Sequence, residues 1–156
     1  MGPILKALNE QFVTVDRRSR ELLALLDQDQ LFRRPDGSPT SMTPFSCGEY
    51  LLRSAGRVEM TFGGITTRLW DDPFEWTLPE QLSTNELILQ YLEEVEATRQ
   101  QSFTFFQTDD DLKKSLPAPV KIITLFELLL ETLATAENYQ GRAIAIFRLF
   151  SNEKLF

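Results

Sequence analysis

The residue types that most often carry catalysis and metal binding are scarce in this chain. Its 156 residues include no histidine and a single cysteine, Cys47. Histidine is the only side chain whose ordinary pKa lies close to neutral pH, and it is the commonest ligand of transition metals. Its absence excludes a papain-like cysteine–histidine pair and the Glu-x-x-His pattern of di-iron bundles.

Cys47 is the remaining candidate nucleophile. It falls at the first position of a predicted helix, where the helix dipole can lower the pKa of a thiol. No histidine is available to act as its base, and an unionised cysteine packs like a small hydrophobic residue. We therefore expect Cys47 to be a semi-buried packing residue.

Two acidic clusters, residues 93–96 and 109–111, could suggest a divalent cation. Neither has the glycine and the terminal glutamate that an EF-hand loop needs at fixed spacing. We expect these carboxylates to face solvent or to cap a helix. The sequence thus predicts no metal site and no cofactor.

Composition and charge narrow the class of protein. A length of 156 residues predicts one domain, spanning 1–156, with a sizeable core. The net charge of -7 repels phosphate backbones, so no nucleic-acid partner is expected. The first residues lack the apolar run of a signal peptide, and no apolar stretch is long enough to span a bilayer. One cysteine suits a reducing compartment, so the predicted location is cytoplasmic, without membrane association.

Hydrophobic periodicity predicts four long helices and no strand. They cover residues 3–26, 47–69, 84–107 and 125–150. One apolar stripe marks each helix, and the four stripes are Leu8, Phe12, Val15, Leu22 and Leu26; Leu51, Ser54, Val58, Phe62, Ile65 and Leu69; Ile88, Tyr91, Val95, Thr98, Ser102 and Phe105; Leu125, Leu129, Leu133, Ala136, Ala143, Phe147 and Phe150.

Three of these helices begin with a capping-box pattern, in which a serine or threonine is followed three residues later by glutamate. The pairs are Ser46 and Glu49, Ser83 and Glu86, and Thr124 and Glu127. Within the second helix, Gly63-Gly64 predicts a bend or the close approach of a neighbouring helix.

The links between the helices are long and rich in proline. The apolar segment 71–82 is expected to pack against the bundle, and 109–111 to cap a short turn. Links of this length permit crossover connections, so the fold class is all-α: a four-helix bundle with long crossover-type loops.

Two segments resemble the DinB-like (DNA-damage-inducible) four-helix bundle superfamily. Ser46-Cys47-Gly48-Glu49-Tyr50-Leu51-Leu52-Arg53-Ser54-Ala55 is similar to the start of that family's second helix. Thr124-Leu125-Phe126-Glu127-Leu128-Leu129-Leu130, leading into Glu137-Asn138-Tyr139-Gln140-Gly141-Arg142, resembles its last helix. Helix order and the proline-rich first loop also fit, so the resemblance covers nearly the whole chain.

The resemblance also implies where a site would lie. Family members commonly hold a metal with three histidines, and the matching positions here are Arg53, Thr135 and Tyr139. Because these side chains are not ligands for nickel or zinc, the family's metal and its metal-dependent thiol chemistry are not carried over. Helical spacing projects Arg57 together with Arg53, and Tyr139 together with Thr135. With Glu131, these residues form the predicted pocket between the second and fourth long helices.

Two interpretations of this pocket follow. A buried guanidinium is costly without a partner, so Arg53 must meet a carboxylate, a phenol or water. We expect an internal salt bridge or polar bridge, for which the candidates are Glu131, Glu137 and Tyr139. Alternatively, Arg53 with a phenol and a hydroxyl could bind a carboxylate or phosphate ligand bidentately.

The function predicted on this basis is a non-catalytic binding or interaction module without the metal site, which could hold a small anionic ligand between the second and fourth long helices. The alternative is an enzyme of the family's transferase or hydrolase kind that works without metal or with an atypical one. It would use Arg53 to bind the anion and Tyr139 or Glu131 to transfer protons. A carboxylate-bound divalent ion is a third option, and it requires acidic side chains that converge inside the bundle.

A second apolar face predicts a homodimer as a partner, or else a groove for a small apolar ligand. More residues than one stripe needs make up this face: Phe103, Phe105, Phe106, Leu128, Leu129 and Leu130.

Overall fold

The computed structural model describes residues 1–36 and 44–156, and most of them are helical. The elements in chain order are α1 (Pro3–Leu25), α2 (Gln28–Leu31), α3 (Cys47–Thr67), the 3-10 helix η1 (Pro73–Trp76), α4 (Asn85–Phe103), the 3-10 helix η2 (Asp109–Lys113), β1 (Ser115–Pro117), β2 (Ile122–Thr124) and α5 (Leu125–Phe150). The all-α prediction is confirmed in that the chain is mostly helical, and the four long helices begin within one residue of the predicted positions, but α3 ends two residues and α4 four residues earlier than the periodicity indicated.

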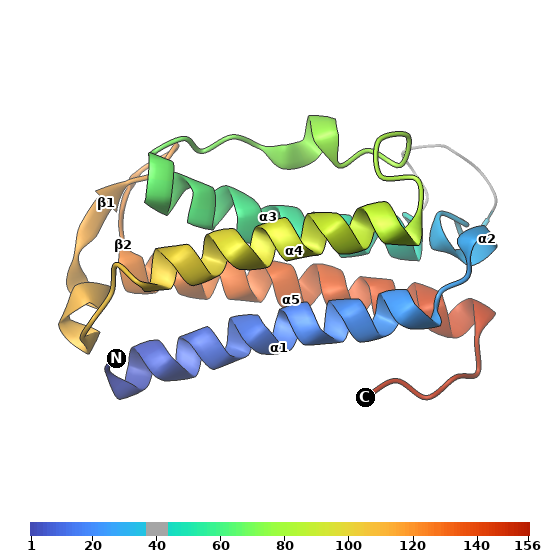
Figure 1. Cartoon of the computed structure of the whole chain (residues 1–156), viewed down its shortest axis with the longest axis horizontal. Coiled ribbons are helices and arrows are strands. Elements are labelled where there is room, and N and C mark those ends of the chain that lie inside the picture. Colours follow the sequence, from blue (N-terminus) through green and yellow to red (C-terminus); the bar gives the residue numbers. More distant parts are fainter. Residues whose placement is uncertain (37–43) are drawn as a thin grey trace.

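The four long helices lie side by side, as Figure 1 shows. α3 packs against α4 and α5, and α1 packs against the same two helices while meeting α3 only slightly. The chain therefore crosses diagonally from α1 to α3 and again from α4 to α5. α3 and α4 run in the same direction, so the chain between them must return along the full length of the molecule (Figure 1).

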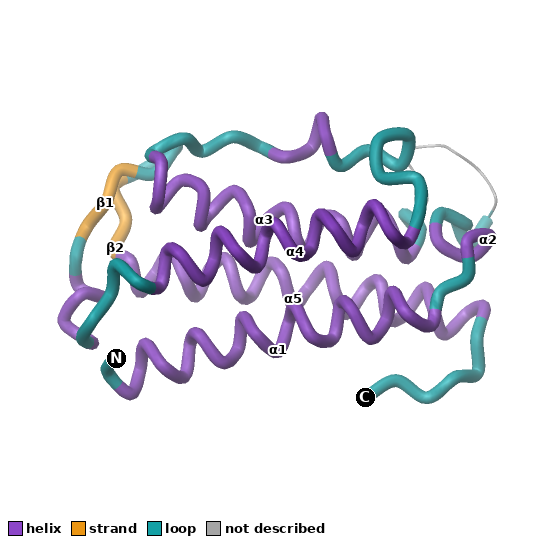
Figure 2. The backbone as a smooth tube through the Cα atoms, in the orientation of Figure 1, coloured by secondary structure: helices purple, strands orange, loops and turns teal. Residues whose placement is uncertain are grey.

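That return is made by residues 68–84, which we call the strap. It includes η1 and runs along α3, as the loop trace in Figure 2 shows. Pro73 of the strap is buried and Trp70 is half-buried. The predicted packing of this apolar segment is thus confirmed at Pro73, whereas Phe74 and Trp76 remain 52% and 44% exposed.

Three glycines let other segments approach α3 closely. A Cβ atom at Gly48 would lie 2.6 Å from the carbonyl oxygen of Leu31, the last residue of α2. One at Gly56 would lie 2.9 Å from the ring of Pro73, and one at Gly64 would lie 2.2 Å from the indole of Trp70. The close approach predicted at Gly63-Gly64 therefore exists, but it is made by the strap and not by a helix, and α3 continues through it.

The helix starts were predicted better than their capping chemistry. Ser46 accepts from the N–H of Glu49, whose carboxylate accepts from the N–H of Ser46, so this capping box is complete. α4 is capped by Thr84 and not by Ser83. Thr124 accepts from the N–H of Glu127, but the carboxylate of Glu127 binds Lys121 instead of reaching back.

The predicted stripes form the core, with exceptions at two helix ends. Leu69 is 61% exposed and Phe105 is 55% exposed, because α3 ends at Thr67 and α4 ends at Phe103. Most of the remaining stripe residues are buried.

A short antiparallel hairpin, in which Leu116 pairs with Ile123, corrects the prediction that the chain has no strand. Each of its strands is three residues long, and β1 ends in a proline, so alternation is too short to detect.

Buried hydroxyl groups join α3 to α5 and α4. Ser54 Oγ donates to the carbonyl of Ala136 at 2.8 Å, and the hydroxyls of Thr61 and Thr132 are 2.7 Å apart. Ser102 Oγ donates to the carbonyl of Phe62 at 3.2 Å. These small side chains satisfy their hydrogen bonds inside the core and allow the helix backbones to lie close together.

The chain itself covers much of the predicted second apolar face. Phe103, Leu128 and Leu129 are buried in its own core, while Phe105 and Leu130 are exposed. The homodimer stays a prediction, and fewer exposed apolar residues remain to form its interface than the sequence suggested.

Replacing Gly48 with alanine should lower the free energy of unfolding by about 1 to 3 kcal/mol, because the new methyl group would collide with the Leu31 carbonyl and the Phe32 ring. Urea denaturation measures the change. Gly141→Ala is the matched control: nothing lies within 4 Å of its added Cβ, so it should be neutral or stabilise by up to about 1 kcal/mol. Equal effects of the two substitutions would contradict the close approach at Gly48.

Candidate functional site

Four of the five predicted site residues line one cavity. Arg53, Arg57, Thr135 and Tyr139 surround a space of about 240 Å³ between α3, α5 and the strap. Asp72, Pro73, Phe74 and Thr77 of the strap form its outer wall, together with Leu52, Gly56 and Met60 of α3. We call it the inner cavity. The family resemblance implied a pocket between these helices, and here residues from 78 to 86 positions apart in the sequence line one space.

Glu131 is not part of this cavity. Its carboxylate lies 3.2 Å from Lys121 Nζ, in a recess beside the hairpin that shares only Arg57 and Met60 with the inner cavity. Glu137, the other acidic candidate, faces Arg18 of α1 at 3.6 Å.

The internal salt bridge expected at Arg53 is therefore not found among the residues that the structure describes, and this expectation is corrected. Within the described residues, neither Arg53 nor Arg57 is in an ion pair, and the seven residues 37–43 include no carboxylate side chain. The acidic candidates are held elsewhere by Lys121 and Arg18, cations that the prediction did not weigh.

Arg53 contacts two aromatic rings and no carboxylate among the described residues. The guanidinium carbon of Arg53 lies 4.2 Å from the ring centroid of Phe45 and 5.8 Å from that of Phe74. Attraction between a cation and an aromatic face contributes about 0.5 to 2 kcal/mol, and it leaves the N–H groups free of a charged acceptor. Arg53 is thus fixed in place while its hydrogen-bonding capacity remains unused by the described residues.

Arg57 lies one helical turn further along α3. Its Nε is buried and has no hydrogen-bond partner among the described residues. Its Nη1 contacts only the sulfur of Met60, at 3.9 Å. A thioether is a weak acceptor, so the guanidinium of Arg57 is poorly satisfied for a half-buried cation.

The α5 side of the inner cavity supplies a hydroxyl and a phenol. Thr135 Oγ1 donates to the carbonyl of Glu131 at 2.8 Å. The ring of Tyr139 stacks on that of Tyr50 with centroids 6.4 Å apart. The Tyr139 hydroxyl has no hydrogen bond among the described residues, so it is available to a ligand.

A second and larger space, which we call the outer cavity, adjoins the first. It measures about 580 Å³ and shares the walls Leu52, Arg53, Phe74 and Thr77 with the inner cavity. Its other lining residues are Phe32, Arg33, Arg34, Phe45, Glu49, Leu78, Pro79 and Glu80. The sequence analysis did not predict the outer cavity, because many of its walls come from the link between α1 and α3 and from the strap, and helical spacing does not place these links.

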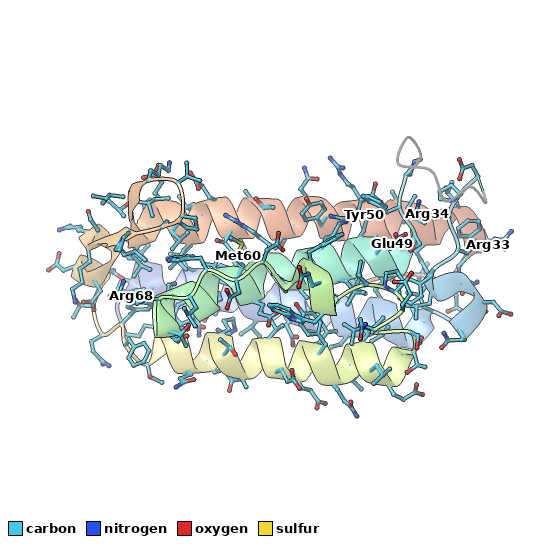
Figure 3. The ribbon with its side chains drawn as sticks, turned by 90° about the horizontal axis from the view of Figure 1, so that it is seen from above. Arg33, Arg34, Glu49, Tyr50, Met60 and Arg68 are labelled. Atoms are coloured by element: carbon cyan, nitrogen blue, oxygen red, sulfur yellow. The ribbon has the colours of Figure 1, made fainter. Side chains whose placement is uncertain are left out.

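The end of the outer cavity next to α2 is built around an ion pair. Arg34 binds the carboxylate of Glu49 through two nitrogens, at 2.5 and 3.1 Å, and Figure 3 shows the two side chains meeting there. Burial opposes ionisation of Glu49, but hydrogen bonds from Arg34 and Ser46 outweigh it and lower the pKa of this carboxyl. Met60 lies farther along α3, toward its Arg68 end (Figure 3).

The strap that covers both cavities is anchored to the helices by Glu59. The carboxylate of Glu59 accepts a hydrogen bond from the Tyr91 hydroxyl of α4 and another from Trp76 Nε1, at 3.4 Å. Burial raises the pKa of Glu59 above its usual value near 4.5. It also raises the pKa of Tyr91 well above the usual tyrosine value of 10. Glu59 therefore connects α3, α4 and the outer wall of the site.

Cys47 is not part of the site. It is 1% exposed, and burial raises the pKa of its thiol to about 12. The thiol is therefore protonated near neutral pH and cannot act as a nucleophile. Its prediction as a packing residue is confirmed, and its burial is more complete than the semi-buried position expected.

Acidic side chains do not converge in the part of the chain that the structure describes. No group of three or more cysteine, aspartate and glutamate side chains there is close enough to hold a metal ion. Likewise, none of the described helices combines the length and apolar character needed to cross a membrane.

We compared the chain with protein-family models, with curated proteins and with solved structures, and none of these comparisons finds a match. The assignment of a role to the cavities therefore rests on their own geometry.

The role of Glu59 predicts a specific pH dependence. A raised pKa means that the folded protein keeps this proton to a higher pH than the unfolded chain does, so the contribution of Glu59 to stability falls as the pH rises from about 4.5 through its folded pKa. Glu59→Gln removes that contribution. In denaturation at pH 4.5 and pH 7.5, the variant should gain stability relative to the unchanged protein at the higher pH.

Glu75→Gln, an exposed change on the same strap, provides the control and should leave the pH dependence unaltered. If Glu59→Gln instead loses stability relative to the unchanged protein as the pH rises, the proposed effect of burial on this carboxyl is wrong.

Proposed function

We propose that this protein is a metal-free, DinB-like four-helix bundle that works as a binding module, and that Arg53 and Arg57 hold the negatively charged group of a small ligand. The observation that carries the proposal is the state of these two guanidinium groups. Both line the inner cavity, and neither has an acidic partner among the described residues.

Energetics supports a ligand at this position. A half-buried cation without a hydrogen-bonding partner lowers stability, whereas the same group contributes about 1.5 to 3 kcal/mol once it binds a charged acceptor. Arg53 is held between Phe45 and Phe74 before any ligand arrives. Little side-chain entropy is then lost on binding, which favours affinity.

The hydroxyls of Thr135 and Tyr139 complete the inner cavity. Both belong to α5 and face the two arginines of α3 across the same space. Tyr139 can donate to an anionic oxygen. This set of two guanidinium groups and a phenol suits a carboxylate or a phosphate better than a cation or a neutral sugar.

The enzymatic alternative loses support from the geometry. It assigned proton transfer to Tyr139 or Glu131, but Glu131 lies outside the cavity and binds Lys121. Tyr139 then stands alone, with no base beside it in the inner cavity except Asp72, whose Oδ1 already accepts from the N–H of Phe74 at 3.1 Å. We therefore propose binding without catalysis.

Anion binding predicts an effect of charge removal that can be measured directly. Acetate, benzoate and inorganic phosphate are titrated into the protein at constant ionic strength, with the melting temperature as the readout. A ligand at a hundred times its dissociation constant adds about 2.7 kcal/mol to stability. Arg57→Met should weaken the stabilising anion at least tenfold, since it removes a charge-assisted hydrogen bond.

Arg148→Met is the control for that titration, because Arg148 is an exposed arginine of α5 that lines neither cavity. Equal losses in the two variants would show that the anions act through the general surface charge, and the proposed site would be rejected.

The metal-free part of the proposal predicts the metal content of the purified protein. Elemental analysis of protein purified without a metal-affinity tag should find no nickel, zinc or iron near one atom per chain, since soft or borderline metals need imidazole or thiolate ligands. A stoichiometric metal would overturn the metal-free part of the proposal, whatever the outcome with anions.

A further inference from the structure

The two cavities differ in what their walls can bind. The inner cavity concentrates charge, through Arg53 and Arg57. Away from its ion pair, the outer cavity is mostly apolar, with walls from Phe32, Phe45, Leu52, Phe74, Leu78 and Pro79. Arg53 belongs to both. A ligand that occupies the two spaces at once must therefore carry an anionic group at one end and an apolar group at the other.

The size of the outer cavity supports an apolar occupant. Its volume of about 580 Å³ lies within the range of small-molecule sites. Leu52 is buried, and Phe32, Phe45, Leu78 and Pro79 are half-buried, so an apolar group placed among them removes further apolar surface from water. A ligand as small as acetate would fill the charged end only.

The charge of the walls favours one negative charge over two. Four arginines line the two cavities, and they are Arg33, Arg34, Arg53 and Arg57. Three carboxylates line them as well, those of Glu49, Asp72 and Glu80. The walls thus carry one net positive charge, which balances a monoanion and leaves a dianion in excess.

The shape of the charged end agrees with a carboxylate. The guanidinium carbon of Arg53 lies over the rings of Phe45 and Phe74, and a guanidinium presents its N–H groups along the edge of a planar fork. A carboxylate is planar and can accept from such an edge through both of its oxygens.

From these observations we infer that the site takes an amphipathic monocarboxylic acid, with the carboxylate at Arg53 and Arg57 and an alkyl or aryl group in the outer cavity between the strap and α3. This inference rests on the proposed function, because it names the ligand class of the same site. It adds a second space and a head-to-tail orientation that anion binding alone does not require.

A series of acids with one head group and different tails tests the inference. Acetate, butyrate, hexanoate and benzoate are titrated into the isotope-labelled protein, and the Nε–H resonances of Arg53 and Arg57 report binding. Each methylene moved from water into the cavity should tighten binding about threefold. Hexanoate should then bind at least tenfold more tightly than acetate, allowing for the cavity's open side.

Two further probes keep the tail and change the head. 1-Hexanol lacks the charge, and hexyl phosphate carries close to two negative charges at pH 8. Hexanoate should bind at least tenfold more tightly than 1-hexanol and at least threefold more tightly than hexyl phosphate. If hexyl phosphate binds more tightly than hexanoate, the monocarboxylate class is wrong.

Substitutions in the outer cavity separate the tail from the head. Leu78 lines the outer cavity only. Leu78→Trp should fill that space and bring hexanoate down to the affinity of acetate, while acetate binding stays unchanged and so reports an intact fold. Should this variant fail to fold, Leu78→Gln makes the wall polar and should reduce the gain from acetate to hexanoate at least threefold.

The outcomes distinguish the inference from the function on which it rests. If acetate and hexanoate bind equally and both depend on Arg57, the anion site stands and the amphipathic ligand is overturned. If no probe shifts the Arg53 or Arg57 resonances, the proposed function and the inference both fail.

Discussion

The close contact between α3 and α5 is the constraint on which the rest of the molecule depends. Ser54, Thr61 and Thr132 place small hydroxyl groups at this contact, each hydrogen-bonded inside the core, and Ala136 adds no bulk. Larger side chains would hold the helices apart. With the backbones this close, long side chains such as Arg53, Arg57 and Tyr139 cannot fit between them, so they emerge along the edge of the contact and line a groove there.

The strap turns that groove into two cavities. Because α3 and α4 run in the same direction, the link between them has to travel back along the molecule, and it does so over the exposed side of α3. Gly56 and Gly64 let it approach, and the hydrogen bonds of Glu59 with Tyr91 and Trp76 fasten it. The topology thus creates both the need for a long link and the wall of the site.

Sequence patterns predicted the parts of this arrangement that local physics determines. Helical periodicity located four helices because each buries one stripe, and the spacing of Arg53 with Arg57 and of Thr135 with Tyr139 put each pair on one helix face. The side chains that Glu131 and Arg53 contact, by contrast, are not determined by local sequence spacing. Glu131 could reach Lys121 only because the hairpin folds back beside α5, and Phe45 and Phe74 meet Arg53 from the α1–α3 link and from η1 of the strap. No spacing rule encodes such contacts, so the salt bridge was expected where a cation–π contact exists.

The same reasoning explains why Arg53 and Arg57 can support a binding site. An arginine in a half-buried position needs a partner, either a permanent carboxylate or a ligand that supplies one. The described residues provide no permanent carboxylate to Arg53, and they hold it with aromatic faces that attract the charge without occupying its N–H groups. These contacts leave the N–H groups of Arg53 open to an anion, as the proposed binding site requires, whereas a closed structural bridge would occupy them.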